Sequence, residues 1–302
     1  MKPFLKNVGI IVLITVALSA LLSTTSLWSL RQSNFYKPSF LANSITEDSF
    51  DYIILGASTG LTTLNTNVID SIVGTVGLNL AMDDTSLATQ YVMLEHFIAL
   101  GKSTTYCILA PSNTSYDVIN NRLSNNDYRF LPYVQNEYVY QHYSQYAIRE
   151  AKLLQYSKFM PMLGVAYYNS EVFYPSINAL LYPEKRNRFD ERGNYTYPGK
   201  NAENSPIVSK DTFEVDFSNP YMKAIKSLCD KQGIQLICYL TPMKEKSVKI
   251  INNDYLVLNH SDSLSNTRYF FDGIHVNSTG RVASSLLFAE QFIKLKNLPF
   301  GE

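Results

Sequence analysis

The sequence predicts an α/β fold in which helices cover both faces of a central parallel sheet. Short apolar runs, several of them ended by a glycine or a proline, alternate with segments whose apolar residues recur at helical spacing. Strands that alternate with helices imply a parallel sheet, and sites in such sheets form at the carboxyl ends of the strands. We expect strands at 52–55, 78–81, 106–110 and 234–240, and helices at 87–98, 221–232 and 278–294.

The N-terminal half of the sheet is predicted from apolar runs and their end signals. The run 52–55 is wholly apolar and ends at Gly56, which is typical of a buried strand followed by a tight turn. After the next strand, residues 83–86 (Asp-Asp-Thr-Ser) offer N-cap side chains for a helix that a glycine ends. The run 106–110 stops at Pro111 and is the third expected strand.

The C-terminal half repeats this alternation. Pro220 opens a predicted helix and Gly233 lies just past its end, which is the usual asymmetry of helix termini. The run 234–240 follows as a strand that a Thr-Pro pair ends. The last helix begins near Asn277 or Ser278, either of which can serve as its cap.

The N-terminus carries an apolar run at about 8–30 without a charged side chain. About 20 helical residues span a bilayer core, so this run is long enough to be a transmembrane helix. Lys2 and Lys6 precede the run, and basic residues ahead of a first span favour a cytoplasmic N-terminus. A cleaved signal peptide is the alternative, although 18–20 (Leu-Ser-Ala) fits a cleavage site poorly. A buried core helix is the third interpretation, and the lack of charge disfavours it.

The domain organisation follows from these segments. We expect a cytoplasmic tip and transmembrane anchor at 1–31, a polar stalk at 32–50 and an α/β domain at 51–302. An insertion at about 112–210 is rich in Tyr, Asn and Ser and has weak periodicity. It is either a substrate cover whose aromatic faces pack on sugar rings or helical packing that completes the globule.

Composition excludes several classes of function. Lys+Arg and Asp+Glu both number 26, so the formal net charge is zero and the basic surface of a nucleic-acid-binding protein is not expected. Three cysteines without a CxxC pair predict neither a disulfide framework nor a zinc site, and Cys107 and Cys238 read as small core residues. The four histidines show no ligand spacing. We therefore expect no metal and no cofactor.

The first candidate for chemistry is Ser58, which follows the first predicted strand. It stands in the run Gly56-Ala57-Ser58-Thr59-Gly60. A serine on a tight strand-to-helix turn is exposed to substrate, and flanking glycines allow the backbone to turn sharply. A serine between two glycines is also common in ordinary turns, so this motif needs support from elsewhere in the chain.

The second candidate group lies before the last helix, where Asp272 precedes His275 across a loop that contains Gly273. A serine hydroxyl needs an adjacent base, and histidine suits that role because its reference pKa is about 6.5. An aspartate fixes the tautomer of the histidine and stabilises the imidazolium. The alternative is a capping Asp and a surface His. Together with Ser58, the pair favours the catalytic interpretation.

The order and context of these blocks resemble the SGNH (GDSL-type) hydrolase superfamily: strand-Gly-x-Ser early, an Asn-containing strand end, and Asp-x-x-His before the C-terminal helix. The resemblance covers about residues 50–110 and 215–295. It implies a three-layer sandwich with a central parallel sheet of SGNH/flavodoxin-like type. It also implies that Ser58 is the nucleophile and that Asp272 and His275 supply the acid and the base.

The sequence departs from the superfamily's pattern in its first and second blocks. The usual Asp before the nucleophile is Ala57, and the glycine whose N–H serves the oxyanion hole falls near Asp84, counted from Asn79. Asn113 is the candidate for the third block's asparagine, so the implied oxyanion hole comprises Ser58, Asp84 and Asn113. Losing one donor costs on the order of a hundredfold or more in rate, so this hole suggests a slow enzyme or a specialised acyltransferase.

The literal Gly-x-Ser-x-Gly at 56–60 also invites an α/β-hydrolase interpretation. In that fold the nucleophile follows several strands, and the acid lies far from the base in sequence. Here Ser58 follows the first soluble strand and Asp272 lies three residues from His275. Both features favour the SGNH interpretation.

The resemblance implies an acyl-ester hydrolase or O-acyltransferase that acts on a cell-envelope glycan or lipid. Such a protein would be single-pass in the inner membrane, with its catalytic domain in the periplasm or outside the cell. Anchored members often act on envelope polysaccharides, sometimes beside a polytopic membrane O-acyltransferase. Two alternatives stay open: a weak or inactive domain that binds glycan or scaffolds an acyltransferase complex, and a general lipase or thioesterase.

Overall fold

The computed structural model describes residues 1–119, 121–199 and 204–296; parts of the predicted insertion and the end of the predicted α/β domain lie outside these ranges. The chain divides into two compact units. The helical unit comprises Met1–Ile45 and Asp127–Asn187, and the sheet unit comprises Thr46–Asn126 and Arg188–Glu302. Each unit is described by itself below.

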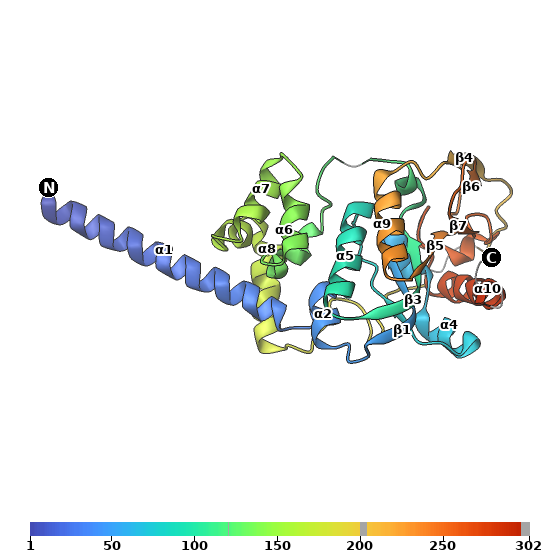
Figure 1. Ribbon diagram of the computed structural model, residues 1–302, viewed down its shortest axis with the longest axis horizontal. Coiled ribbons are helices and arrows are strands. Elements are labelled where there is room, and N and C mark those ends of the chain that lie inside the picture. Colours follow the sequence, from blue (N-terminus) through green and yellow to red (C-terminus); the bar gives the residue numbers. More distant parts are fainter. Residues whose placement is uncertain (120, 200–203, 297–302) are drawn as a thin grey trace. The chain divides into compact units, whose positions relative to one another are not determined.

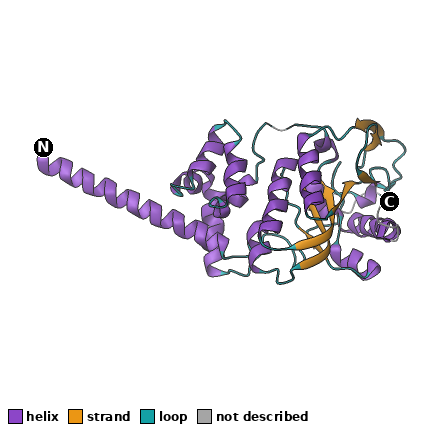
Figure 2. Cartoon of the chain, in the orientation of Figure 1, coloured by secondary structure: helices purple, strands orange, loops and turns teal. Residues whose placement is uncertain are grey.

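The strands of the sheet unit are drawn in orange in Figure 2. Five of them form a central sheet in which every pairing is parallel, in the order β2-β1-β3-β5-β7. The predicted α/β class with a parallel sheet is therefore confirmed. All four predicted strands are present, and β7 is an addition. The strands are β1 (Ser49–Gly56), β2 (Gly77–Asn79), β3 (Ser103–Ala110), β5 (Gln235–Leu240) and β7 (Leu256–Asn259).

The strand order reverses at β1, and this reversal positions the site. β2 pairs with β1 on one side, with Ile54 opposite Asn79, and β3 pairs on the other side, with Gly56 opposite Ala110. Connections that leave a parallel sheet in opposite directions open a crevice at the carboxyl ends of the strands. The residue that follows Gly56 therefore enters this crevice.

The sheet is held by apolar side chains on its strands and by the last helix. Residues 52–55 of β1 are each no more than 1% exposed, as expected for a strand covered on both faces. Phe292 of α10 (Ser278–Lys296) packs edge-on against Tyr52, with ring centroids 5.5 Å apart, and Phe288 packs in the same way on Tyr239. Such aromatic pairs add to the stabilisation from buried area.

The helices of the sheet unit begin and end largely as the sequence signals indicate. Asn277 caps α10, since its side-chain oxygen accepts the backbone N–H groups of Thr279 and Gly280. Ser86 occupies the N-cap position of α5, but its side chain makes no capping hydrogen bond there. The other helices of this unit are α3 (Ser58–Thr63), α4 (Thr66–Val73), α5 (Leu87–Ala99) and α9 (Pro220–Lys231), with short 3-10 turns at Asn113–Tyr116 and Thr267–Tyr269.

A second, two-stranded parallel ribbon pairs β4 (Asp211–Val215) with β6 (Lys246–Ile250). Most of its side chains are exposed or half-buried. The sequence therefore lacks the apolar run that predicts a strand, and neither strand was expected.

The helical unit corrects two predicted boundaries. Residues 37–41 form most of a short helix and are buried in the helical unit. The predicted stalk at 32–50 is therefore not a stalk. Of the predicted insertion at 112–210, only Asp127–Asn187 belongs to this unit. Its elements are α1 (Lys2–Arg31), α2 (Lys37–Asn43), a 3-10 segment (Asp127–Tyr133), α6 (Glu137–Ser144), α7 (Arg149–Tyr156) and α8 (Met162–Leu181) (Figure 1).

The first helix, α1, has 30 residues and is long and apolar enough to cross a membrane. Residues 2–22 expose most of their side chains, whereas Ser23, Ser26, Leu27, Ser29 and Leu30 are buried within the unit. Among the described residues, the apolar N-terminal half of α1 is thus without protein cover.

Candidate active site

Three side chains from two distant parts of the chain meet at the carboxyl end of β1. The Oγ atom of Ser58 lies 2.8 Å from Nε2 of His275. The Nδ1 atom of His275 lies 2.8 Å from Oδ2 of Asp272. All three residues belong to the sheet unit. The structure therefore brings together the three residues that the sequence singled out as nucleophile, base and acid.

Ser58 is the first residue of α3 and is half-buried. The glycines on either side matter for a reason other than the expected one, since neither has a left-handed backbone. A Cβ atom on Gly56 would lie 2.1 Å from the carbonyl oxygen of Ala110, and one on Gly60 would lie 2.6 Å from the same atom. The glycines thus let the turn that carries Ser58 pack directly on the end of β3.

The loop that carries the other two residues is held by its own hydrogen bonds. Oδ1 of Asp272 accepts the backbone N–H groups of Ile274, at 2.9 Å, and His275, at 2.8 Å. The side-chain amide of Asn277 donates to the carbonyl of Arg268 at 2.7 Å. The aspartate therefore fixes the loop with one oxygen and the histidine ring with the other.

These contacts define the protonation pattern of the site. Partial burial raises the pKa of Asp272, but the hydrogen bonds from the His275 ring and from the two backbone N–H groups outweigh it, so the pKa lies below its ordinary value. An ionised carboxylate only accepts, so Nδ1 of His275 carries the proton. Nε2 is then the acceptor for the hydroxyl proton of Ser58, which is the arrangement of a general base beside a nucleophile.

Two aromatic residues support the histidine, and no sequence motif predicts their role. Tyr197 stacks on Phe271, with centroids 4.3 Å apart and planes at 11°, and its ring packs edge-on against His275 at 5.2 Å. Tyr197 also forms a parallel bridge with Asn277. Burial, followed by nearby Tyr195 and Asp272, raises the pKa of the Tyr197 hydroxyl. The phenol thus stays neutral beside the acid–base pair.

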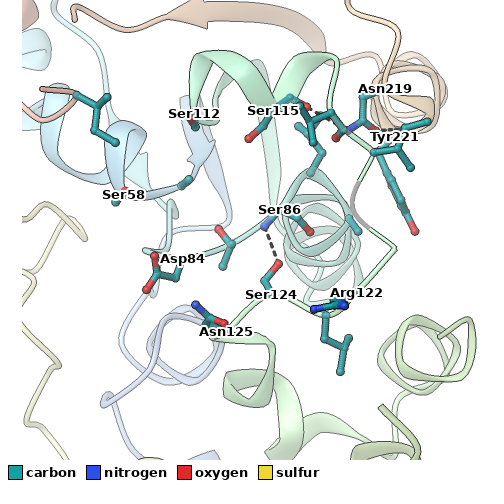
Figure 3. Close-up of a pocket in the computed structure, with 18 residues that line it drawn as sticks. Ser58, Asp84, Ser86, Ser112, Ser115, Arg122, Ser124, Asn125, Asn219 and Tyr221 are labelled. Atoms are coloured by element: carbon teal, nitrogen blue, oxygen red, sulfur yellow. Dashed lines mark hydrogen bonds between the residues drawn. The ribbon is translucent and has the colours of Figure 1, made fainter. Parts of the chain in front are cut away.

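A cavity of about 480 Å³ opens beside Ser58 (Figure 3). Asp84 and Arg122 are its charged lining residues among those described. One wall is held by a 2.8 Å hydrogen bond from the backbone N–H of Ser86 to Oγ of Ser124 (Figure 3). Hydroxyls and amides from the strand ends and the loop after β3 supply most of the remaining polar lining: Ser112, Ser115, Asn125 and Asn219.

Asp84 lies in this cavity with Ser58, as the resemblance implied. Its φ of 50° places it in the left-handed region that favours glycine and that aspartate tolerates better than most residues. The backbone at position 84 thus has a conformation suited to the glycine that the superfamily pattern expects. Asp84 lines the cavity, and its side chain is exposed.

Asn113 does not lie in the cavity with Ser58 and Asp84, which corrects its assignment to the oxyanion hole. Its amide is 2% exposed and is absent from the cavity lining. Nδ2 donates to the carbonyl of Thr241 at 2.8 Å, and Oδ1 accepts the backbone N–H of Thr241 at 2.9 Å and its hydroxyl at 3.2 Å. The side chain clamps the end of β3 to the end of β5, and both of its polar atoms are engaged in that task.

Within the described ranges, no group of three or more His, Cys, Asp or Glu side chains could hold a metal ion. Cys107, Cys229 and Cys238 are free and buried, and burial raises the pKa of Cys238. His142 pairs with Asp127 within the helical unit.

Comparison with known proteins assigns this chain to no family. A scan against protein-family models found no match, and a search of curated proteins also found none. The likeness to the SGNH superfamily thus stays an inference from motifs and geometry.

Proposed function

We propose that the chain is a membrane-anchored serine enzyme of SGNH type that hydrolyses acyl esters or transfers acyl groups. The observation that carries this proposal is a pair of 2.8 Å contacts, one between Ser58 and His275 and one between His275 and Asp272. Nucleophile, base and orienting acid stand in the order that acyl transfer to a serine requires.

The fold supports the same assignment. The order β2-β1-β3-β5-β7 is that of a flavodoxin-like sheet, and the nucleophile follows β1 at the point where the order reverses. α10 packs with α3 and α4, and α5 packs with α9, which is consistent with a three-layer sandwich. The acid and base come from one loop before the last helix, as in the SGNH pattern.

The proposed cycle needs only these groups and the substrate. Oγ of Ser58 attacks the ester carbonyl while Nε2 of His275 takes the hydroxyl proton. The tetrahedral intermediate collapses, the leaving alcohol receives that proton from His275, and an acyl-serine remains. Water or a sugar hydroxyl then attacks the acyl-serine, gives its proton to His275, and Ser58 regains a proton as the acid or the new ester leaves. Asp272 holds the imidazolium throughout.

The oxyanion would be held by backbone N–H groups. Ser58 opens α3, so its N–H has no carbonyl partner inside the helix. The left-handed backbone at Asp84 supports a second N–H donor there. Because the amide of Asn113 is bonded to Thr241, we propose a hole of two backbone donors without a side-chain amide.

The lining of the cavity suits both parts of an acylated glycan. Hydroxyls and amides beside Ser58 suit sugar hydroxyl groups, and the apolar side chains of Val118, Ile119 and Ile274 suit an acyl group. With α1 as a single inner-membrane span and Lys2 and Lys6 on the cytoplasmic side, the sheet unit would face the periplasm or the cell exterior. We therefore propose a cell-envelope glycan as acyl donor or acceptor, with a polytopic membrane O-acyltransferase as a possible source of acyl groups.

A second candidate function is a glycan-binding or scaffolding domain with little activity. Two observations favour it: the carboxylate of Asp84 borders the cavity, where it would repel a developing oxyanion, and Asn113 is committed elsewhere. Removing one donor from an oxyanion hole costs on the order of a hundredfold or more in rate.

Labelling with a fluorophosphonate separates the two functions. The full chain in detergent is treated with the probe, and the adduct is located by peptide mass spectrometry. We expect labelling of Ser58 that is lost in Ser58→Ala and His275→Ala and kept in Ser112→Ala, a serine of the same cavity. Absence of labelling in a sample that unfolds cooperatively would overturn the enzyme proposal.

Hydrolysis and transfer are separated by the acceptor. The enzyme is given an activated acetyl ester with and without oligosaccharides, and both free acetate and acetylated sugar are measured. Acetate alone assigns a hydrolase, and acceptor-dependent acetylated sugar assigns a transferase.

A further inference from the structure

The corner between α7 and α8 exposes large apolar side chains. Tyr156 is 51% exposed, Phe159 is 72% exposed and Met160 is 51% exposed. We call these three residues the α7–α8 corner. Single exposed apolar residues are ordinary, but a contiguous group of aromatic and sulfur-containing side chains at one corner marks an interaction surface.

The position of this corner along α1 is set by contacts inside the helical unit. Ser19, Leu22 and Ser23 of α1 line a groove together with Met162 and Val165 from the start of α8. Further on, Oγ of Ser29 donates to the carbonyl of Ser176, at 3.0 Å. The backbone N–H of Asn34 then donates to the carbonyl of Pro183. The two helices therefore run parallel, and the start of α8 lies beside Ser19–Ser23.

The length of α1 places a membrane boundary at the same level. The inner boundary lies at the lysines that precede the apolar run, because charged side chains stay at the interface. Counted from Lys2 or from Lys6, about 20 residues cross a hydrocarbon core and bring the helix to between Leu22 and Ser26. The whole helix has 30 residues, so its last turns stand clear of the core.

We propose that the α7–α8 corner rests in the outer interface of the membrane that α1 crosses, with a lipid bilayer as its partner. The start of α8 contacts α1 at the boundary, so the residues just before Met162 meet the headgroup region. Tyrosine and phenylalanine suit that region because their rings bury apolar area there. The helical unit would thus hold two contacts with the bilayer, the span of α1 and this corner. The proposal rests on α1 being a membrane span and not on the acyl chemistry.

Fluorescence quenching by lipid tests this contact in the full chain. Trp28 is the one tryptophan of the sequence, so Trp28→Phe gives a background without indole. Phe159→Trp in that background reports on the corner. Tyr182→Trp is the matched control, because Tyr182 is 62% exposed and follows the end of α8, beyond the kink at Asn169 and beside the hydrogen bond between Asn34 and Pro183. Both variants are reconstituted into phosphatidylcholine vesicles with acyl chains brominated near the headgroup.

We expect both variants to float with the vesicles, and the bromines to reduce the emission of the indole at position 159 by about twofold or more, with little effect at position 182. Flotation without quenching at position 159 would leave α1 as an anchor and overturn the membrane contact of the corner. Equal quenching at positions 159 and 182 would also overturn the proposal, since the start and the end of α8 would then lie at the same depth in the bilayer. Failure to float would remove the span on which the proposal depends and would overturn it too. None of these outcomes bears on the labelling of Ser58.

Discussion

Nε2 of His275 lies 2.8 Å from Oγ of Ser58, although 217 positions separate the two residues in the chain. The contact exists because β1 delivers the serine to the crevice of the sheet, while a loop locked by Asp272 delivers the ring from the start of α10. Each side of the contact is built locally. The parallel sheet needs only to bring the two pieces together.

Replacing Asp272 by Asn removes the charge that orients and stabilises the imidazolium. We expect Asp272→Asn to lower the rate of Ser58 acylation on the order of a thousandfold, because the amide can leave the ring in the wrong tautomer. The rate of fluorophosphonate labelling, followed by gel fluorescence, measures this effect. A rate within threefold of the parent, about 0.6 kcal/mol, would contradict the orienting role.

The same variant changes how stability depends on pH. The pKa of Asp272 is lowered in the folded chain, so its contribution is complete above the ordinary aspartate pKa and is lost as pH falls through the lowered value. We expect the melting temperature of the parent to exceed that of Asp272→Asn near neutral pH. The gap should begin to close below about pH 4, the ordinary aspartate pKa, and should vanish only below the lowered pKa of Asp272. Melting curves across that pH range measure the difference. A gap that widens in acid would contradict the sign of the shift.

The turn that carries Ser58 depends on the lack of side chains at Gly56 and Gly60. A Cβ at either position would overlap the carbonyl oxygen of Ala110, which is backbone and cannot rotate away. We expect Gly56→Ala and Gly60→Ala each to reduce the free energy of unfolding by about 3 kcal/mol or more. Gly273→Ala is the control, because a Cβ there meets nothing within 4 Å, and its effect should stay within about 0.5 kcal/mol. Denaturant titrations measure all three.

The parts of the fold that the sequence predicted are those with continuous apolar runs. β1, β3 and β5 are buried along nearly their whole length, and burial on both faces leaves a run that is readable without knowing the partner strands. β7 has four residues and is only partly buried, and β4 is mostly exposed. Their pairing depends on neighbours that the sequence does not reveal.

The residues of the candidate site also differ in whether the sequence alone could predict them. Ser58, Asp272 and His275 were predictable because each stands in a short motif next to a strand or helix end. Asn113 was misassigned because the direction of a side chain after a strand depends on the loop, and here it turns back to Thr241. Tyr197 was missed because a single tyrosine in a loop carries no signal of the ring that it contacts.

Asn113 is expected to act on stability and not on the chemical step. Asn113→Ala leaves the buried backbone N–H of Thr241 without its partner, which costs about 2–3 kcal/mol. Asn125→Ala, an exposed amide of the cavity, should cost less than about 0.5 kcal/mol. Unfolding free energies and labelling rates are measured for both. A large loss of rate for Asn113→Ala at unchanged stability would restore it to the oxyanion hole.

Asp84 combines a glycine-like backbone with a charge that opposes an oxyanion, and substitutions can separate these two properties. Asn tolerates the left-handed region and carries no charge. We therefore expect Asp84→Asn to raise the acylation rate severalfold with little change in melting temperature. Asp84→Ala also removes the charge, but the left-handed conformation should cost it about 1 kcal/mol of stability.

Asp84→Asn and a third substitution, Asp84→Gly, also test the proposed backbone donor. If the N–H of residue 84 holds the oxyanion, the acylation rate of Asp84→Asn should exceed that of the parent, and the rate of Asp84→Gly should at least equal that of Asp84→Asn. Both variants keep the backbone conformation. Rates at low and high salt add a second measurement. The advantage of Asn over Asp should shrink as salt screens the exposed carboxylate. An unchanged rate in both variants would show that position 84 does not face the reacting carbonyl, and the hole would then need another donor.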